Sequence, residues 1–247
     1  MSTRASDKQA DQPPRPQKLS LAPPPLENGD RLTRLEFERR YDAMPGLKKA
    51  ELIEGVVYMP SPVRVKNHGR PHGHIMSWVG VYCAATPGVE FADNTTVRLD
   101  PDNEPQPDLA LWLPEAAGGR ARVSEDDYLE GAPEMIVEVA SSSAAYDLHD
   151  KLNAYRRNGV EEYVVWRVLD RQIDWFALEA ERYTRMSPDA EGTLQSRGFP
   201  GLRLCVPALL DGDLARVLAE LQIGLASEEH AAFVSRLASA PGNNGGS

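Results

Sequence analysis

The chain has 247 residues, a formal net charge of −10, and a composition of 41% hydrophobic and 26% charged residues. This is the balance of a water-soluble globular protein, and the length favours one domain. No apolar run approaches the roughly 18 residues of a membrane span, and the N-terminus lacks the apolar core of a secretory signal, so a membrane protein is excluded and the cytoplasm is the expected location. The acidic charge argues against indiscriminate binding to nucleic acid.

Cysteine usage excludes two further classes. Cys83 and Cys205 are far apart and form no CxxC motif, so neither a disulfide framework nor a thiolate zinc site is indicated, and both are expected to be buried. Composition also divides the chain: residues 1–29 and 239–247 are expected to be disordered tails, and residues 30–238 one folded domain.

Helix and strand patterns follow one another from Thr33 onward. Thr33 and Glu36 form a capping-box pattern that predicts a helix over residues 33–44. Residues 51–59 alternate as in a strand with a bend at Gly55, and residues 74–86 predict a second helix.

The middle of the chain alternates between strand and helix patterns. Three strand-like segments come first, then a helix from near Tyr146 that ends at Gly159, then further strands, and helices beyond about residue 206. The predicted fold is α/β, with a central mixed sheet flanked by helices. The strand-like segments cover residues 91–99, 107–113, 135–141, 161–168, 173–179 and 182–186.

Two acidic residues interrupt apolar strand patterns. Asp108 begins the run LALWL after Pro107, and Glu138 stands within MIVEVA. Burying a charge is costly unless it is paired or binds metal, and hard carboxylate oxygens suit Mg²⁺ or Mn²⁺. The spacing alone is equally compatible with Asp108 capping a turn and Glu138 pairing with a core cation.

Lys151 follows the Glu138 strand on the next predicted helix. Asp147 precedes Lys151 by one turn, so the two side chains share a helix face. Alone, such a pair is more often a solvated surface salt bridge.

Together, the strings PQPDLALW, PEMIVEVASSS and YDLHDKLNAYRRNGVEEYVVW resemble the motif series of the Uma-type branch of the PD-(D/E)XK nucleases. The resemblance covers roughly residues 33–205. It implies a restriction-endonuclease-like sheet, a homodimer, Mg²⁺ or Mn²⁺ as cofactor, and Asp108 and Glu138 as metal ligands. It also implies an upstream glutamate in the site, for which Glu51 is preferred over Glu54.

One position departs from the superfamily pattern. The motif lysine normally stands two residues after the second acid, where this chain has Ala140. In the Uma-type branch a lysine of the following helix takes its place, and Lys151 matches it. Its implied role is to orient the attacking water and to offset negative charge on the phosphate.

Histidines cluster at NHGRPHGH, which contains His68, His72 and His74. The mixture with Arg70 and glycine favours an exposed loop over a zinc site. His72 matches a histidine common in the family, so a supporting role near the cleft is expected.

The resulting hypothesis is a metal-dependent endonuclease that hydrolyses phosphodiester bonds, with DNA as the preferred substrate. Two alternatives remain open at this point. One is a nuclease fold that binds nucleic acid or protein without catalysis, which Ala140 and the net charge favour. The other is a hydrolase of a different phosphorylated substrate.

Overall fold

The computed structural model describes residues 22–59, 64–141 and 143–240. Its centre is a six-stranded sheet of order β11-β10-β9-β8-β5-β3. Only β8 and β9 run parallel to each other, and the other neighbours are antiparallel. The prediction of an α/β fold with a mixed sheet flanked by helices is therefore confirmed. The strands are β3 (Glu90–Asp93), β5 (Leu109–Trp112), β8 (Met135–Ala140), β9 (Glu162–Arg167), β10 (Gln172–Glu179) and β11 (Arg182–Arg185).

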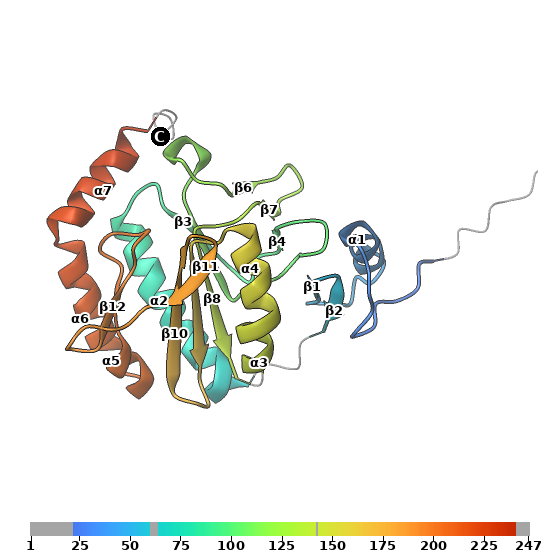
Figure 1. Cartoon of the computed structure of the whole chain (residues 1–247), viewed down its shortest axis with the longest axis horizontal. Helices are drawn as coiled ribbons and strands as arrows, with labels where there is room; N and C mark the ends of the chain where they lie inside the picture. The colour runs from blue at the N-terminus through green and yellow to red at the C-terminus, as the bar shows by residue number, and fades with distance from the viewer. Residues whose placement is uncertain (1–21, 60–63, 142, 241–247) are drawn as a thin grey trace, which may run out of the picture.

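Helices cover both faces of this sheet (Figure 1). On one face, Val137 and Val139 of β8 pack in a core with α2 (Arg70–Ala85), α5 (Val206–Asp211), α6 (Leu214–Leu225) and α7 (Glu228–Ala238). On the other, Ile136 and Ala140 pack beneath the segment that joins β8 to β9. That segment consists of α3 (Ala144–Tyr146), one turn of π-helix η3 (Asp147–Lys151), and α4 (Leu152–Asn158). It supplies the crossover that parallel strands require.

The N-terminal part forms a small unit beside the sheet, at the right of Figure 1. Its core surrounds Phe37 of α1 and Leu52 of β1. The remaining elements are short. They are α1 (Arg34–Asp42), β1 (Glu51–Ile53), β2 (Val56–Tyr58), η1 (Val65–Gly69), β4 (Val97–Arg98), η2 (Glu115–Ala117), β6 (Arg122–Val123), β7 (Leu129–Glu130), β12 (Thr193–Gln195) and β13 (Arg203–Cys205).

Three local predictions need correction. Thr33 is the N-cap residue of α1, but its side chain makes no capping hydrogen bond. The predicted bent strand over residues 51–59 is a hairpin of β1 and β2, because Glu54 and Gly55 both have positive φ and reverse the chain. The predicted strand over residues 91–99 divides between β3 in the central sheet and β4 in a smaller sheet.

The predicted N-terminal tail extends partly into the folded core. Leu26 is buried against the α1 and β1 unit, and the Gly29 amide donates to the Val57 carbonyl at 2.8 Å. The remainder of the predicted tail, residues 1–21, lies outside the described residues, as do residues 241–247. No helix in the described part of the chain is long and apolar enough to span a membrane.

Candidate active site

The two predicted metal ligands lie opposite each other on neighbouring strands. β5 and β8 pair antiparallel with Leu109 opposite Val137, so continuing this register by one residue places Asp108 opposite Glu138. Directly opposed residues of an antiparallel pair project from the same face. Asp108 accepts a 2.7 Å hydrogen bond from the Val139 amide, which fixes its carboxylate on β8. Both acids are only 4% exposed.

Lys151 reaches this face from the crossover segment. Its Nζ lies 2.8 Å from Oε1 of Glu138 and 3.8 Å from Oδ1 of Asp147. Lys151 and Asp147 are 3% and 2% exposed, so the alternative of a solvated surface pair is wrong. The π-helical turn from Asp147 to Lys151 lies on the Glu138 face of β8, and such turns often occur at functional sites.

Glu51 completes the group from the N-terminal unit. Its Oε1 lies 2.9 Å from Lys151 Nζ and accepts a 2.8 Å hydrogen bond from the Gln106 amide. Glu54, the less favoured candidate, instead occupies the β1–β2 turn and pairs with Arg157 at 2.7 Å. The structure thus brings Glu51, Glu138 and Lys151 together, with Asp108 beside them.

His68 and His72 both contact Asp108, whereas the sequence predicted a supporting role for His72 alone. Nε2 of His68 lies 3.2 Å from Oδ1 of Asp108. Nε2 of His72 lies 3.0 Å from the Asp108 carbonyl oxygen and 3.1 Å from Oδ1 of Asp93. The predicted exposed loop is wrong, because residues 65–69 form a π-helical turn that continues into α2. The available signal was the four-residue spacing of His68 and His72, which puts both on one helix face.

The electrostatics of the cluster follow from its excess of carboxylates. Burial raises the pKa of Glu138 to about 8; Lys151 opposes that shift, while Asp147, Asp108 and Glu51 add to it. Burial also raises the pKa of Asp147. Burial would raise the pKa of Asp108 as well, but His68, the charge of Lys49 and the hydrogen bond from Val139 together lower that pKa.

Lys151 remains charged in this environment. Burial alone would lower its pKa, but the charges of Glu138 and Glu51 raise it well above the usual value. Tyr155 donates a 3.0 Å hydrogen bond to Oε1 of Glu138, the oxygen that Lys151 also contacts. One ammonium therefore lies within 4 Å of three buried carboxyl groups, those of Glu51, Glu138 and Asp147.

The carboxylates of Asp108 and Glu138 fit a divalent cation that takes only part of its ligands from the protein. Within residues 22–59, 64–141 and 143–240, no three His, Cys, Asp or Glu side chains converge as a ready-made metal site. Lys151 lies between Glu51 and Glu138 and takes one oxygen of each. Mg²⁺ commonly uses one or two carboxylates and completes its shell with water and substrate phosphate. Asp108 and Glu138 suffice for that mode.

The two arginines near the end of α4 have partners within the protein. Arg156 donates to the Glu181 carbonyl at 2.9 Å, so it and Arg157 are both engaged within the protein. Cys205 is buried as expected, whereas Cys83 is only partly buried.

The order of these elements, with an acid before β5, an acid inside β8 and a lysine on the crossover, agrees with a family-level match. The Uma2 family, described as "Putative restriction endonuclease", matches residues 35–207. The chain belongs to this family. The matched range includes every residue of the candidate site, and the resemblance inferred from the motifs is thereby confirmed.

A solved structure supports the fold. The chain is similar to a crystal structure described as a putative nuclease belonging to DUF820 from Anabaena variabilis, with a TM-score of 0.50 and 14% sequence identity. The alignment covers 69% of this chain and 97% of that one. No curated protein matched this sequence.

Proposed function

We propose that this protein is a metal-dependent nuclease that hydrolyses phosphodiester bonds, with DNA as the preferred substrate. The observation that carries the proposal is the register that places Asp108 opposite Glu138 on β5 and β8, with Lys151 in contact with Glu138, within a chain of the Uma2 family.

Asp108 and Glu138 are the residues that would hold Mg²⁺ or Mn²⁺. When bound there, the cation supplies Lewis-acid polarisation of the phosphate and lowers the pKa of a coordinated water. Around it, His68 and the Val139 amide hold the Asp108 carboxylate, and Tyr155 holds Glu138. These contacts restrict the rotamers of both acids before substrate arrives.

Lys151 would act on the substrate side of the same group. Its ammonium is fixed by Glu51 and Glu138, and a phosphate group entering beside it would gain a fully charged donor in a buried setting. Glu51 would serve as a positioning residue, because the Gln106 amide anchors the oxygen that contacts Lys151.

The direct test uses purified protein with supercoiled plasmid, linear duplex DNA, single-stranded DNA and RNA, each with MgCl₂, MnCl₂ or EDTA. We expect cleavage with divalent cation, none with EDTA, and loss of cleavage in Asp108→Asn. Asp170→Asn, at an exposed surface residue, is the matched control. Cleavage that persists at the wild-type rate in Asp108→Asn would refute the assignment.

A binding module without catalysis is the second candidate. The observation that favours it is the engagement of Lys151 with both glutamates, together with Ala140 at the position of the motif lysine. Binding of nucleic acid without cleavage under every cation tested would support this candidate. Cleavage of a phosphodiester model substrate, with none of any nucleic acid, would indicate a different phosphorylated substrate.

A further inference from the structure

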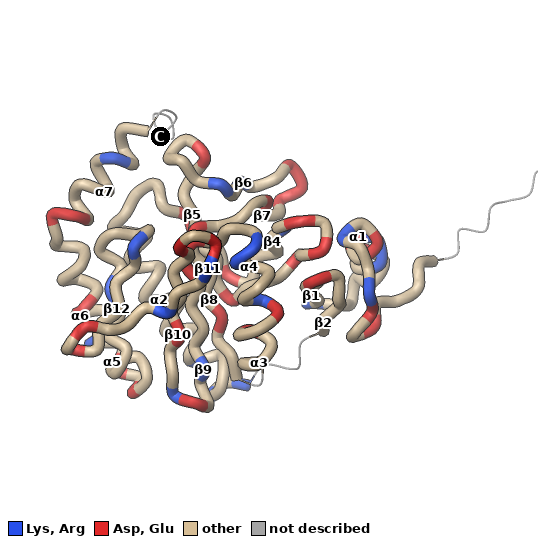
Figure 2. Tube along the Cα trace, in the orientation of Figure 1, with Lys and Arg blue, Asp and Glu red and all other residues tan. Residues whose placement is uncertain are grey.

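A cavity lies between α1 and the small sheet of β4, β6 and β7, and Gln106 is the one residue of the candidate active site that lines it. Its volume is about 220 Å³. Figure 2 shows acidic segments along the loops of β4, β6 and β7 that face α1. The lining comprises four carboxylates, one arginine, two neutral polar residues and three aromatic rings: Glu38, Asp42, Glu104, Asp126, Arg98, Thr96, Gln106, Phe37, Tyr41 and Tyr128.

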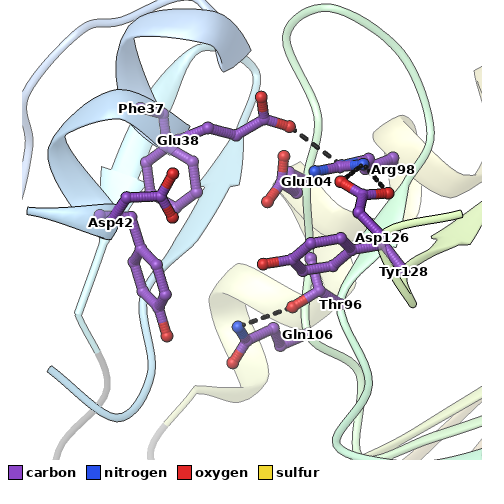
Figure 3. Close-up of a pocket in the computed structure, with 10 residues that line it drawn as sticks. Phe37, Glu38, Asp42, Thr96, Arg98, Glu104, Gln106, Asp126 and Tyr128 are labelled. Atoms are coloured by element: carbon purple, nitrogen blue, oxygen red, sulfur yellow. Dashed lines mark hydrogen bonds and ion pairs between the residues drawn. The ribbon is translucent and has the colours of Figure 1, made fainter. Parts of the chain in front are cut away.

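Arg98, the arginine of this lining, is already neutralised. Its Nε lies 3.0 Å from Glu38, its Nη1 lies 2.8 Å from Asp126, and its guanidinium stacks 4.0 Å from the centre of the Tyr128 ring. Figure 3 shows Glu38, Glu104 and Asp126 gathered around Arg98, with Asp42 on the α1 side of the cavity. Among the described residues, Arg98 forms ion pairs with Glu38, Asp126 and Glu130, and none with Glu104 or Asp42.

Glu104 is the decisive residue. It is only 5% exposed, and its Oε2 is buried with no hydrogen-bond partner among the described residues. Burial, together with the adjacent carboxyl of Glu38, raises the pKa of Glu104 to about 8. The protonated Glu104 carboxyl can donate to Glu38, so these two acids can share one proton without a ligand. A cation held in the cavity would replace that proton and allow both carboxylates to ionise.

We propose that this cavity binds a small organic cation through an ammonium or guanidinium group that Glu104 and Asp42 neutralise. A metal ion fits less well, because two of the four carboxylates, Glu38 and Asp126, already form ion pairs with Arg98. The volume exceeds that of a single ion and admits several heavy atoms. The rings of Tyr41 and Tyr128 suit such a group, since cations are attracted to aromatic faces.

The cavity shares one residue with the candidate active site. The side chain of Gln106 lines the cavity and donates to Thr96 at 2.9 Å, while its backbone amide donates to Glu51. Glu104 also pairs through its backbone with Leu52, next to Glu51. A ligand held by Glu104 would thus lie directly behind the segment that anchors Glu51.

Calorimetric titration of the full chain with butylammonium chloride and with butylguanidinium chloride, at constant ionic strength, tests the proposal. We expect saturable binding with one site per chain and competition between the two probes. Glu104→Gln and Asp42→Asn should each weaken binding roughly tenfold or more. The matched control, Glu228→Gln at the start of α7, should bind as the wild type does. Absence of saturable binding of either probe at millimolar concentration would overturn the proposal.

Thermal unfolding separates ligand binding from a structural role. Without ligand, Glu104→Gln should melt at the same temperature or higher, because the amide can donate to Glu38 in place of the protonated acid. A lower melting temperature combined with unchanged probe binding would overturn the proposal. So would heat from MgCl₂ that Glu104→Gln abolishes while neither organic cation binds.

Discussion

Lys151 carries the most specific expectation at the scale of single residues. It is buried, and its nearest partners are the carboxylates of Glu51 and Glu138. A lysine that only neutralised these acids would matter for folding alone. A lysine that also faces substrate phosphate would matter for turnover.

Lys151→Met should reduce cleavage by about 100-fold or more, since deletion of one electrostatic donor in an enclosed site has an effect of that order. The same variant should bind Mn²⁺ more tightly, because it removes a positive charge adjacent to Glu138. Single-turnover cleavage and Mn²⁺ calorimetry measure the two effects. Lys48→Met, at an exposed residue, serves as the control. Near-normal cleavage by Lys151→Met would remove Lys151 from the proposed chemistry.

His68 allows a second test at the scale of single residues, with a substitution outside the strands of the central sheet. Its Nε2 contacts Asp108, and its Nδ1 has no partner among the residues described. His68→Ala should weaken cleavage by about 10-fold, because Asp108 loses one of the two contacts that orient it. His74→Ala, two residues beyond His72, is the matched control. Equal cleavage rates for the two variants would contradict the positioning role.

At the scale of elements, Glu162 of β9 links residues 196–198 to the central sheet through hydrogen bonds. Its carboxylate accepts hydrogen bonds from Trp175 Nε1, Ser196 Oγ and the amides of Arg197 and Gly198, at 2.6–2.8 Å. The backbone nitrogens of Arg197 and Gly198 and the indole nitrogen of Trp175 are donors only and cannot accept a hydrogen bond. A carboxylate is therefore the side chain that this position requires.

Glu162→Gln should lower the free energy of unfolding by about 2 kcal/mol, because either orientation of the amide turns its NH₂ toward a donor. Urea unfolding followed by tryptophan fluorescence measures this change. Glu161→Gln, at the exposed neighbour, should shift it by less than about 0.5 kcal/mol. Equal stability of the two variants would show that the Glu162 contacts contribute nothing net.

At the scale of the whole molecule, charge limits how the protein can bind nucleic acid. The net charge is −10, and most arginines in the described ranges are paired with acids of the chain itself. The ion-paired arginines are Arg34, Arg39, Arg40, Arg98, Arg120, Arg122, Arg157, Arg167, Arg171, Arg185, Arg197 and Arg203. Together with Lys151, these arginines account for 13 of the 23 described Lys and Arg residues, so fewer than half are left to displace counterions from a duplex.

Duplex binding should therefore depend only moderately on salt. A slope of log K against log [salt] of magnitude below about 4 is expected, since each neutralised phosphate contributes about 0.9. Fluorescence anisotropy of Asp108→Asn with a labelled duplex measures it without cleavage. A slope as steep as that of a protein with many phosphate contacts would show that an extended basic surface binds the DNA.

Assembly is a further whole-molecule prediction. The resemblance to the Uma-type nucleases implies a homodimer, so light scattering after gel filtration should give twice the chain mass of 27.2 kDa. A monomer at micromolar concentration would contradict this expectation.

The sequence by itself determined the features that depend on local periodicity. The apolar runs LALWL and MIVEVA predicted two buried strands, and Asp108 and Glu138 stood out as acids at the start of one run and inside the other. Gly159, which the structure shows at φ 82°, marked the end of the crossover helix. These predictions hold because the direction of a side chain in a strand or helix is determined by the few residues around it.

Only the tertiary structure decided which distant residues meet. Glu51 and Glu54 stand three residues apart, and the hairpin turn alone determines that Glu51 faces Lys151 while Glu54 faces Arg157. The contact of His68 with Asp108 likewise depends on how α2 docks against β5. Such choices follow from packing and desolvation across the whole fold, where a buried charge is tolerated only beside a partner that no local pattern identifies.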